Sequence, residues 1–247
     1  MNSIPIFGVL VLNRGDLLLR LFESIDYPVD EFIIINNGKA KDVREAIEKI
    51  VDMFPGKVRV RTPEKNTGVA PGWNWIFTNF DKPWYFIAGN DVMFTPGDLE
   101  KMATVAWEKH EVVGKVFGNQ GHNAHITTKL ALEKVGLYDE NFYPAYLEDC
   151  DYMWRCKLTG VERAETPGCN IIHGEAPLWG SSTIHSNNEY RILNGITHGN
   201  GFKYYHHKWG GNNDAEVYEH PYNNPEMGPK DWIFYPELRE MNDIWGV

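Results

Sequence analysis

The chain has 247 residues, of which 43% are hydrophobic, and this composition suits one globular domain with a sizeable core. Its formal net charge of −10 argues against a nucleic-acid partner, which requires a basic face. The three cysteines lack CxxC spacing, which argues against a disulfide framework or a structural zinc site and favours a reducing compartment.

Strands alternate with helices through the first 110 residues. Strands are predicted at 4–12, 32–35, 58–61 and 84–88, and helices at 17–24, 41–53, 68–80 and 96–110. Asp16 is placed to cap the first helix. This alternation predicts an α/β fold with a mainly parallel central sheet flanked by helices.

The pattern changes after residue 118. Residues 126–134 predict a strand that runs into a short helix, and residues 147–158 predict a helix that begins with acids. Within that helix, Asp151 and Arg155 are four residues apart and are expected to pair on the surface. After residue 168 we expect an irregular region rich in aromatic residues and histidine. The expected organisation is a catalytic domain at 1–185 and an extension at 186–247 that packs on it.

The segment WYFIAGNDVMF, residues 84–94, places Asp91 directly after a buried strand. A carboxylate there is costly to desolvate, so it either caps the following turn or binds a divalent metal that holds a phosphate. Two other predicted strands also end in polar residues, at Asn13 and at Asn36-Asn37. Because ligands bind at the carboxyl ends of parallel strands, these ends predict a site.

Five segments, in this order, resemble a GT-A glycosyltransferase of the family 2 kind. They are IPIFGVLVLNRGDLLLRLFESI, FIIINNGK, NTGVAPGWN, AGNDVMF and VGLYDENFYPAYLEDCDYMWRCKLTG. The resemblance covers roughly residues 4–185 and implies a Rossmann-like GT-A fold. It also implies that the nucleotide-sugar is bound by Asn13, Arg14, Asn36, Asn37, Asn66, Gly68, Asn74 and Asn90.

The resemblance further implies a metal site and a base. Asp91 and His173 would hold Mn²⁺ or Mg²⁺, although His173 can equally be a strand-end histidine satisfied by the backbone. Asp149 would be the general base, with Glu148 and Asp151 beside it raising its pKa by repulsion. The alternative is that these three acids only cap a helix.

Two positions depart from the family pattern. Asn36 stands where an aspartate usually contacts the nucleoside, and an amide there can still donate and accept hydrogen bonds. Gly89 stands at the first carboxylate of the metal motif. The sequence therefore predicts a metal site that depends on Asp91 and a distant ligand.

The C-terminal region offers weaker signals. Tyr204, Tyr205 and Trp209 form either a sugar-stacking wall or part of the core, and Lys208 is expected in solvent. No segment is long enough for a transmembrane helix and none reads as a signal peptide, so a cytoplasmic protein is expected.

Together these features predict an inverting glycosyltransferase that moves a sugar from a nucleotide-diphospho-sugar, with UDP favoured, to a hydroxyl of a glycan or another acceptor. The alternatives are a non-catalytic carbohydrate- or nucleotide-binding protein on the same scaffold and, ranked last, a nucleotidyltransferase. The oligomeric state stays open.

Overall fold

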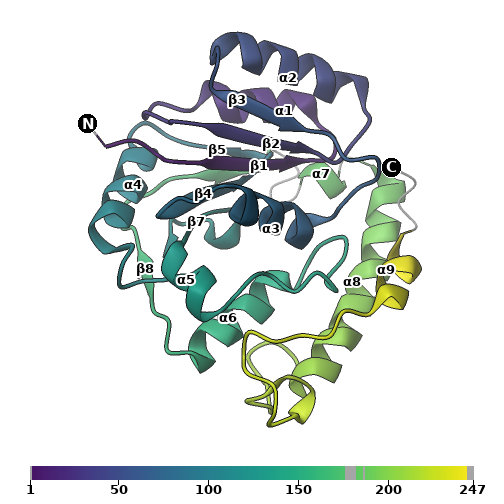
Figure 1. Ribbon diagram of the computed structural model, residues 1–247. Coiled ribbons are helices and arrows are strands. Elements are labelled where there is room, and N and C mark those ends of the chain that lie inside the picture. The colour runs from purple at the N-terminus through teal and green to yellow at the C-terminus, as the bar shows by residue number, and fades with distance from the viewer. Residues whose placement is uncertain (1, 176–181, 186, 244–247) are drawn as a thin grey trace.

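Strands from both halves of the chain form one seven-stranded sheet in a computed structural model, which describes residues 2–175, 182–185 and 187–243 (Figure 1). The strands are β1 (Phe7–Val11), β2 (Phe32–Asn36), β3 (Val58–Arg61), β4 (Trp84–Gly89), β5 (Val92–Met93), β6 (Lys115–Phe117), β7 (Ala124–Thr128), β8 (Arg163–Glu165) and β9 (Ile172–His173). The helices are α1 (Gly15–Glu23), α2 (Lys41–Met53), α3 (Val69–Asn79), α4 (Asp98–Lys109), α5 (Lys129–Lys134), α6 (Glu148–Leu158), α7 (Ser182–His185), α8 (Asn188–Trp209) and α9 (Pro236–Asn242), with short 3₁₀ turns at Gly121–Asn123 and Pro221–Asn223.

The sheet order is β3-β2-β1-β4-β7-β6-β8. Strands β1 to β4 pair in parallel, β7 runs antiparallel to its neighbours β4 and β6, and β6 pairs in parallel with β8. The predicted α/β fold with a mainly parallel sheet is therefore confirmed. Strands β5 and β9 form a separate antiparallel pair.

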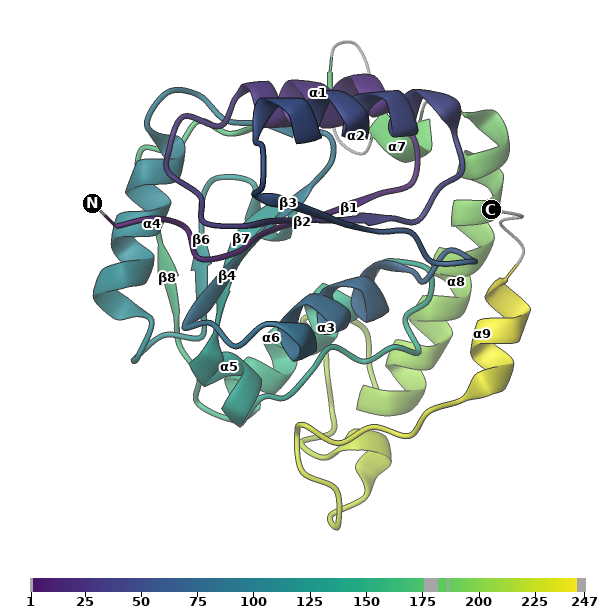
Figure 2. The same ribbon diagram turned by 45° about the horizontal axis from the view of Figure 1, so that its top comes forward.

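Both faces of the sheet are covered, which explains the continuous apolar runs in its strands. Along β2, Phe32 and Ile34 join the core under α1, α2 and α4, whereas Ile33 and Ile35 join the core under α3, α5 and α6. Figure 2 shows α1 and α2 on one side of the sheet and α3, α5 and α6 on the other. The parallel strands therefore present their carboxyl ends along one edge between two helical layers.

The first helix begins differently from the prediction. Asp16 was predicted as its cap, but α1 begins at Gly15 after Arg14, which has a left-handed backbone (φ 62). The Gly15 N–H donates to the Asp42 carboxylate at 2.9 Å, and a Cβ on Gly15 would lie 2.2 Å from the Asp42 carbonyl oxygen. Glycine at position 15 therefore lets α1 start early against α2. Asp16 instead pairs with Arg14.

The predicted irregular region is wrong for Asn188–Trp209, which forms the 22-residue helix α8. Its buried face includes Thr197, Gly201 and Lys208 beside Tyr204, Tyr205 and Trp209, so no apolar stripe marks it in the sequence. The three aromatic side chains pack with Phe142 and Leu147, as the core interpretation predicts. The boundary expected after residue 185 falls at residue 186, which lies outside the described residues. Among the described residues, no helix is both long and apolar enough to cross a membrane.

Candidate active site

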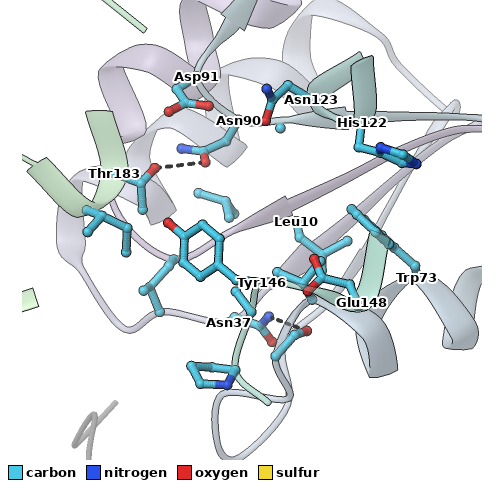
Figure 3. Close-up of a pocket in the computed structure, with 18 of the residues that line it drawn as sticks. Leu10, Asn37, Trp73, Asn90, Asp91, His122, Asn123, Tyr146, Glu148 and Thr183 are labelled. Carbon is cyan, nitrogen blue, oxygen red and sulfur yellow. Dashed lines mark hydrogen bonds between the residues drawn. The ribbon is translucent and has the colours of Figure 1, made fainter. Parts of the chain in front are cut away.

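A cavity of about 280 Å³ opens at the carboxyl ends of β1, β2 and β4. Its wall is completed by the β6–β7 connection, the start of α6, β9 and α7. Figure 3 labels side chains from each of these segments except β9, and they converge on the cavity. Eight of the predicted site residues line this cavity: Asn37, Asn66, Gly68, Asn90, Asp91, Glu148, Asp149 and His173.

The remaining predicted site residues do not line the cavity; they are Asn13, Arg14, Asn36, Asn74 and Asp151. Asn74 is buried and exchanges hydrogen bonds with the backbone of Tyr138, at 2.9 Å in each direction. Asn13 donates to the Thr183 carbonyl oxygen at 3.0 Å, and Arg14 pairs with Asp16 and Glu175. In this structure these three side chains hold neighbouring segments together.

Asn37 and Asn66 shape the loop before α3. The Asn37 side-chain oxygen accepts from the backbone N–H of Thr67 at 3.1 Å and from its hydroxyl at 2.9 Å, and its amide donates to the Gly68 carbonyl at 3.3 Å (Figure 3). The Asn66 side chain accepts from the Gly68 N–H at 2.8 Å. These bonds fix the loop against the end of β2. Asn36, also at that strand end, is buried with Oδ1 unpartnered among the described residues.

Asp91 and His173 come together through the β5–β9 pair. Val92 pairs with His173, the Gly174 N–H donates to the Asp91 carbonyl at 2.8 Å, and His173 Nε2 lies 3.3 Å from Asp91 Oδ1. Two adjacent ligands of an octahedral ion, each about 2.1 Å from it, are roughly 3 Å apart. The separation and the carboxylate–imidazole donor set therefore fit Mn²⁺ or Mg²⁺.

Position 89 faces the same site. A Cβ on Gly89 would lie 3.2 Å from Asp91 Oδ1, so a side chain there would enter the space beside the pair. Among the described residues, no group of three histidine, cysteine or acidic side chains is arranged to hold a metal. The described part of the chain thus offers Asp91 and His173 as two candidate side-chain ligands, and an ion bound there would need further oxygen ligands from a substrate or water.

Arg20 on α1 supports this pair from behind and was missed by the sequence reasoning. Its guanidinium donates to the carbonyl oxygens of Asp91 at 3.1 Å and Gly174 at 2.9 Å. It therefore links the two backbone segments that carry Asp91 and His173. No sequence signal distinguishes Arg20 from an ordinary helix arginine, because its partners are backbone atoms of distant segments.

The acids at the start of α6 occupy two environments. Glu148 is only 6% exposed, and burial raises its pKa well above the usual 4.5, with the charge of Asp149 adding to the shift. The Asp149 side chain is 34% exposed, and its Oδ2 lies 3.6 Å from Nδ1 of His122. Asp149 is therefore the more accessible of the two carboxyl groups at the cavity.

Asp151 and Arg155 were predicted to pair on the surface, and this is wrong, since both side chains are fully buried. Asp151 also accepts from Lys208 at 2.6 Å and Trp209 at 2.8 Å, and Lys208 reaches Asp139 at 2.8 Å. The expectation that Lys208 is solvated is likewise wrong. Burial alone would raise the pKa of Asp151, but the Arg155 and Lys208 charges outweigh it and hold this pKa below its usual range. Asp151 thus connects α6 to α8.

His122, in the β6–β7 connection, is a cavity residue that the sequence reasoning did not select. Burial lowers its pKa to about 4, and the nearby charge of Lys115 contributes. Behind it, Lys115 is fully buried among Thr127, Tyr138 and Tyr152, and burial lowers its pKa to about 7. His122 is therefore neutral near pH 7. Its position in an irregular segment left no periodic signal.

A family profile described as glycosyl transferase family 2 matches residues 7–169, and the chain belongs to this family. A galactofuranosyl glycosyltransferase of Leishmania donovani is 23% identical over 231 residues, covering 63% of this chain and 53% of the relative. The chain thus spans about half the length of that relative.

Two solved structures resemble the fold. The mannosyltransferase PcManGT of Pyrobaculum calidifontis, in complex with GDP-Man and Mn²⁺, has a TM-score of 0.59 and 14% identity, covering 80% of this chain and 64% of that one. GalNAc-T7, solved with UDP, GalNAc and Mn²⁺, has a TM-score of 0.60 and 9% identity, covering 83% of this chain and 50% of that one. At these identities the likeness establishes the GT-A fold.

Proposed function

We propose that this chain is an inverting glycosyltransferase that moves a sugar from a nucleotide-diphospho-sugar to a hydroxyl group of a glycan or another acceptor. One observation carries the proposal: the Asp91–His173 pair and the Asp149 carboxyl line the same cavity. Such a cavity has one part suited to a metal-bound diphosphate and another suited to a base. The family assignment and the relative described as a galactofuranosyl glycosyltransferase support it.

The cavity wall supports the proposal that a divalent metal takes part. Among the described lining residues there is no lysine or arginine, whereas Asp91, Glu148 and Asp149 are all acidic residues. A diphosphate would therefore meet no lysine or arginine among the described lining residues. A divalent ion on Asp91 and His173 supplies the positive charge that stabilises the leaving diphosphate. Mn²⁺ is favoured over Mg²⁺ because an imidazole is one of the two ligands.

The residues left for the nucleoside lie at the end of β2 and in the loop before α3. Asn37, Asn66 and Gly68 line the cavity there, with backbone groups held by the side-chain bonds described above. The Asn37 side chain is engaged with Thr67 and Gly68, so the backbone of this loop is the part left to contact a nucleoside. UDP is the nucleotide that we propose first, and the similar fold of GalNAc-T7, which was solved with UDP, supports this choice.

Asp149 is proposed as the general base. As the acceptor oxygen attacks the anomeric carbon, the bond from that carbon to the diphosphate oxygen breaks and the diphosphate keeps the electron pair. Asp149 takes the acceptor proton. A single displacement of this kind inverts the configuration at the anomeric carbon. His122, 3.6 Å from Asp149, is placed to orient the carboxylate.

A second candidate function is carbohydrate or nucleotide binding without transfer. Gly89 favours it, because the metal site then has one carboxylate from its own loop. We rank it second because Asp149 remains accessible at the cavity. A nucleotidyltransferase fits less well, because the described cavity wall lacks the basic side chains that a triphosphate loop provides.

The test is a panel of nucleotide-sugars with Mn²⁺, Mg²⁺ or chelator. We expect one UDP-sugar to raise the melting temperature in Mn²⁺ and to be hydrolysed slowly without acceptor. Binding without turnover, even with a wide acceptor panel, would favour the second candidate. If no nucleotide-sugar is bound or turned over, the transferase proposal and the nucleotide-binding form of the second candidate are both contradicted.

A further inference from the structure

Glu148 has a carboxyl oxygen with no hydrogen-bond partner. The residue is 6% exposed and lines the cavity, and its Oε2 is buried and unpartnered among the described residues. Buried polar atoms in native proteins are nearly always paired, so such an atom in a cavity wall points to a partner from outside the chain, a bound ligand or an ordered water. Figure 3 shows this carboxyl group on the side of the cavity that Leu10 and Trp73 line.

The backbone before Glu148 holds this side chain in place. Tyr146 and Leu147 both have left-handed backbones, with φ of 79 and 72, before α6 begins at Glu148. Two consecutive non-glycine residues of this kind cost free energy and persist only where the surroundings impose them. The terminal torsion of a glutamate is soft, so the unpartnered oxygen can turn to meet a ligand without disturbing the helix.

The groups around Glu148 suit an uncharged ligand. Trp73 presents an aromatic ring, and His122, whose Nε2 is also buried without a partner among the described residues, is neutral near pH 7. An aromatic surface beside neutral hydrogen-bonding groups matches a sugar ring and its hydroxyls, whereas a phosphate would meet no positive charge here.

We propose that Glu148 binds a hydroxyl group of a sugar substrate as a neutral carboxylic acid, which donates one hydrogen bond and accepts another. This inference rests on the proposed function and divides the two adjacent acids by role. Asp149, with a side chain 34% exposed, acts as the base, and Glu148 acts as a specificity residue. When two neighbouring carboxyl groups lie in different environments, their pKa values differ, so one site can hold both an acid and a base.

The charge balance at Glu148 supports the neutral form. Burial and the Asp149 charge raise the pKa of Glu148, and this outweighs the backbone hydrogen bonds at Glu148 and Tyr146 that favour the ionised form. Asp151 adds little repulsion because Arg155 and Lys208 pair with it. His122 faces the site from the β6–β7 connection, and Asp91 and His173 lie on other segments of the same cavity wall.

The first test needs no turnover. Difference infrared spectra of the wild-type chain and Glu148→Gln at pH 7 should show the carbonyl band of a protonated carboxylic acid that the variant lacks. Wild-type spectra without that band would overturn the proposal, even if the chain is a glycosyltransferase. Conversely, a band in a chain that turns over no nucleotide-sugar would remove the proposed function and leave the neutral acid established.

The second test compares two substitutions at position 148 in the active enzyme. Glutamine keeps a donor and an acceptor, so Glu148→Gln should lower kcat/KM about threefold, whereas Glu148→Ala should lower kcat/KM about thirtyfold, since the hydroxyl then loses its partner. Equal losses in both variants would show that an ionised carboxylate is needed and would overturn the proposal. If the variants also lose hydrolysis of the donor without acceptor, Glu148 contacts the donor sugar. If they lose only transfer, Glu148 contacts the acceptor. If Glu148→Ala does not fold, the glutamine variant and the spectra still decide.

Discussion

The guanidinium of Arg20 donates a hydrogen bond to the main-chain carbonyl of Asp91 at 3.1 Å and reaches the Gly174 carbonyl, next to His173, at 2.9 Å. One side chain on α1 therefore bridges two segments that also pair as β5 and β9. The proposed metal site has only two side-chain ligands among the described residues, so their separation matters more than it would in a site with three or four.

Replacing Arg20 should therefore weaken metal binding. We expect Arg20→Met to reduce Mn²⁺ affinity about tenfold, the lower end for loss of a supporting group around a metal site. Calorimetry with Mn²⁺ and UDP measures it. Arg44→Met is the matched control, since Arg44 also donates to a carbonyl, that of Lys39, but on the exposed side of α2. Equal affinities in the two variants would show that Arg20 does not position the ligands.

Adding the missing carboxylate should strengthen the metal site. A Cβ at position 89 lies 3.2 Å from Asp91 Oδ1, so Gly89→Asp brings a second carboxylate next to the first. We expect about tenfold tighter Mn²⁺ binding and a lower melting temperature in chelator, because two carboxylates repel without the ion. Gly89→Asn is the control, because asparagine adds a side chain of nearly the same size without the negative charge. No gain in affinity with aspartate would mean that the metal does not bind beside Asp91.

Removing the base should abolish transfer and spare donor binding. Asp149→Asn keeps the size of the side chain but cannot accept the acceptor proton, so kcat should fall about 10²- to 10⁴-fold. Donor affinity, measured by calorimetry with Mn²⁺, should change little because Asp149 is assigned to the acceptor. Transfer at the wild-type rate would remove Asp149 from the mechanism.

The buried ion network should be expensive to break. Lys208→Met leaves Asp139 and Asp151 without their shared cation, and loss of one partner of a buried pair costs about 3–5 kcal/mol of unfolding free energy. Urea unfolding measures this cost. Lys203→Met on the same helix is the control, because Lys203 is exposed. A loss no larger than the control's would show that Lys208 is not a structural cation.

The raised pKa of Glu148 gives stability a definite pH dependence. Unfolded chains release this proton near pH 4.5, whereas the folded chain retains it, so the unfolded state binds fewer protons above that pH. The contribution of Glu148 to the unfolding free energy therefore falls as pH rises from 4.5 towards its folded pKa, by at most about 1.4 kcal/mol per pH unit. Glu148→Gln removes the effect, so its stability relative to wild type should increase over that range. If the unfolding free energies of wild type and Glu148→Gln, measured in urea, change with pH in parallel, the raised pKa of Glu148 is contradicted.

The strands and the site loops could be predicted because their signals are local. Val58–Arg61 and Lys41–Met53 have the predicted bounds, and eight of the predicted site residues line one cavity. Parallel strands bring their carboxyl ends to one edge, so polar residues that follow buried runs converge there. Asn74 shows the limit, since an amide in a site motif looks the same whether it binds a ligand or, as here, the backbone of Tyr138.

Helix α8 and the network around Lys208 could not be predicted in the same way. Period-based reasoning finds a helix by its apolar stripe, and the buried face of α8 carries a threonine, a glycine and a lysine. Lys208 is buried because Asp139 and Asp151 lie opposite it, and those partners come from distant parts of the chain.

Sequence by itself thus determined the α/β sheet, the family and the positions of Asp91, Glu148 and Asp149, because strand periodicity and turn residues act over a few neighbours. Tertiary structure alone decided which acids face the cavity and which are neutralised. Only folding brings together the segments that set burial, the Arg20 bridge between Asp91 and Gly174, and the distance from His122 to Asp149. Electrostatic free energies follow those distances and the local exclusion of water, so the roles of neighbouring carboxyl groups are set in space.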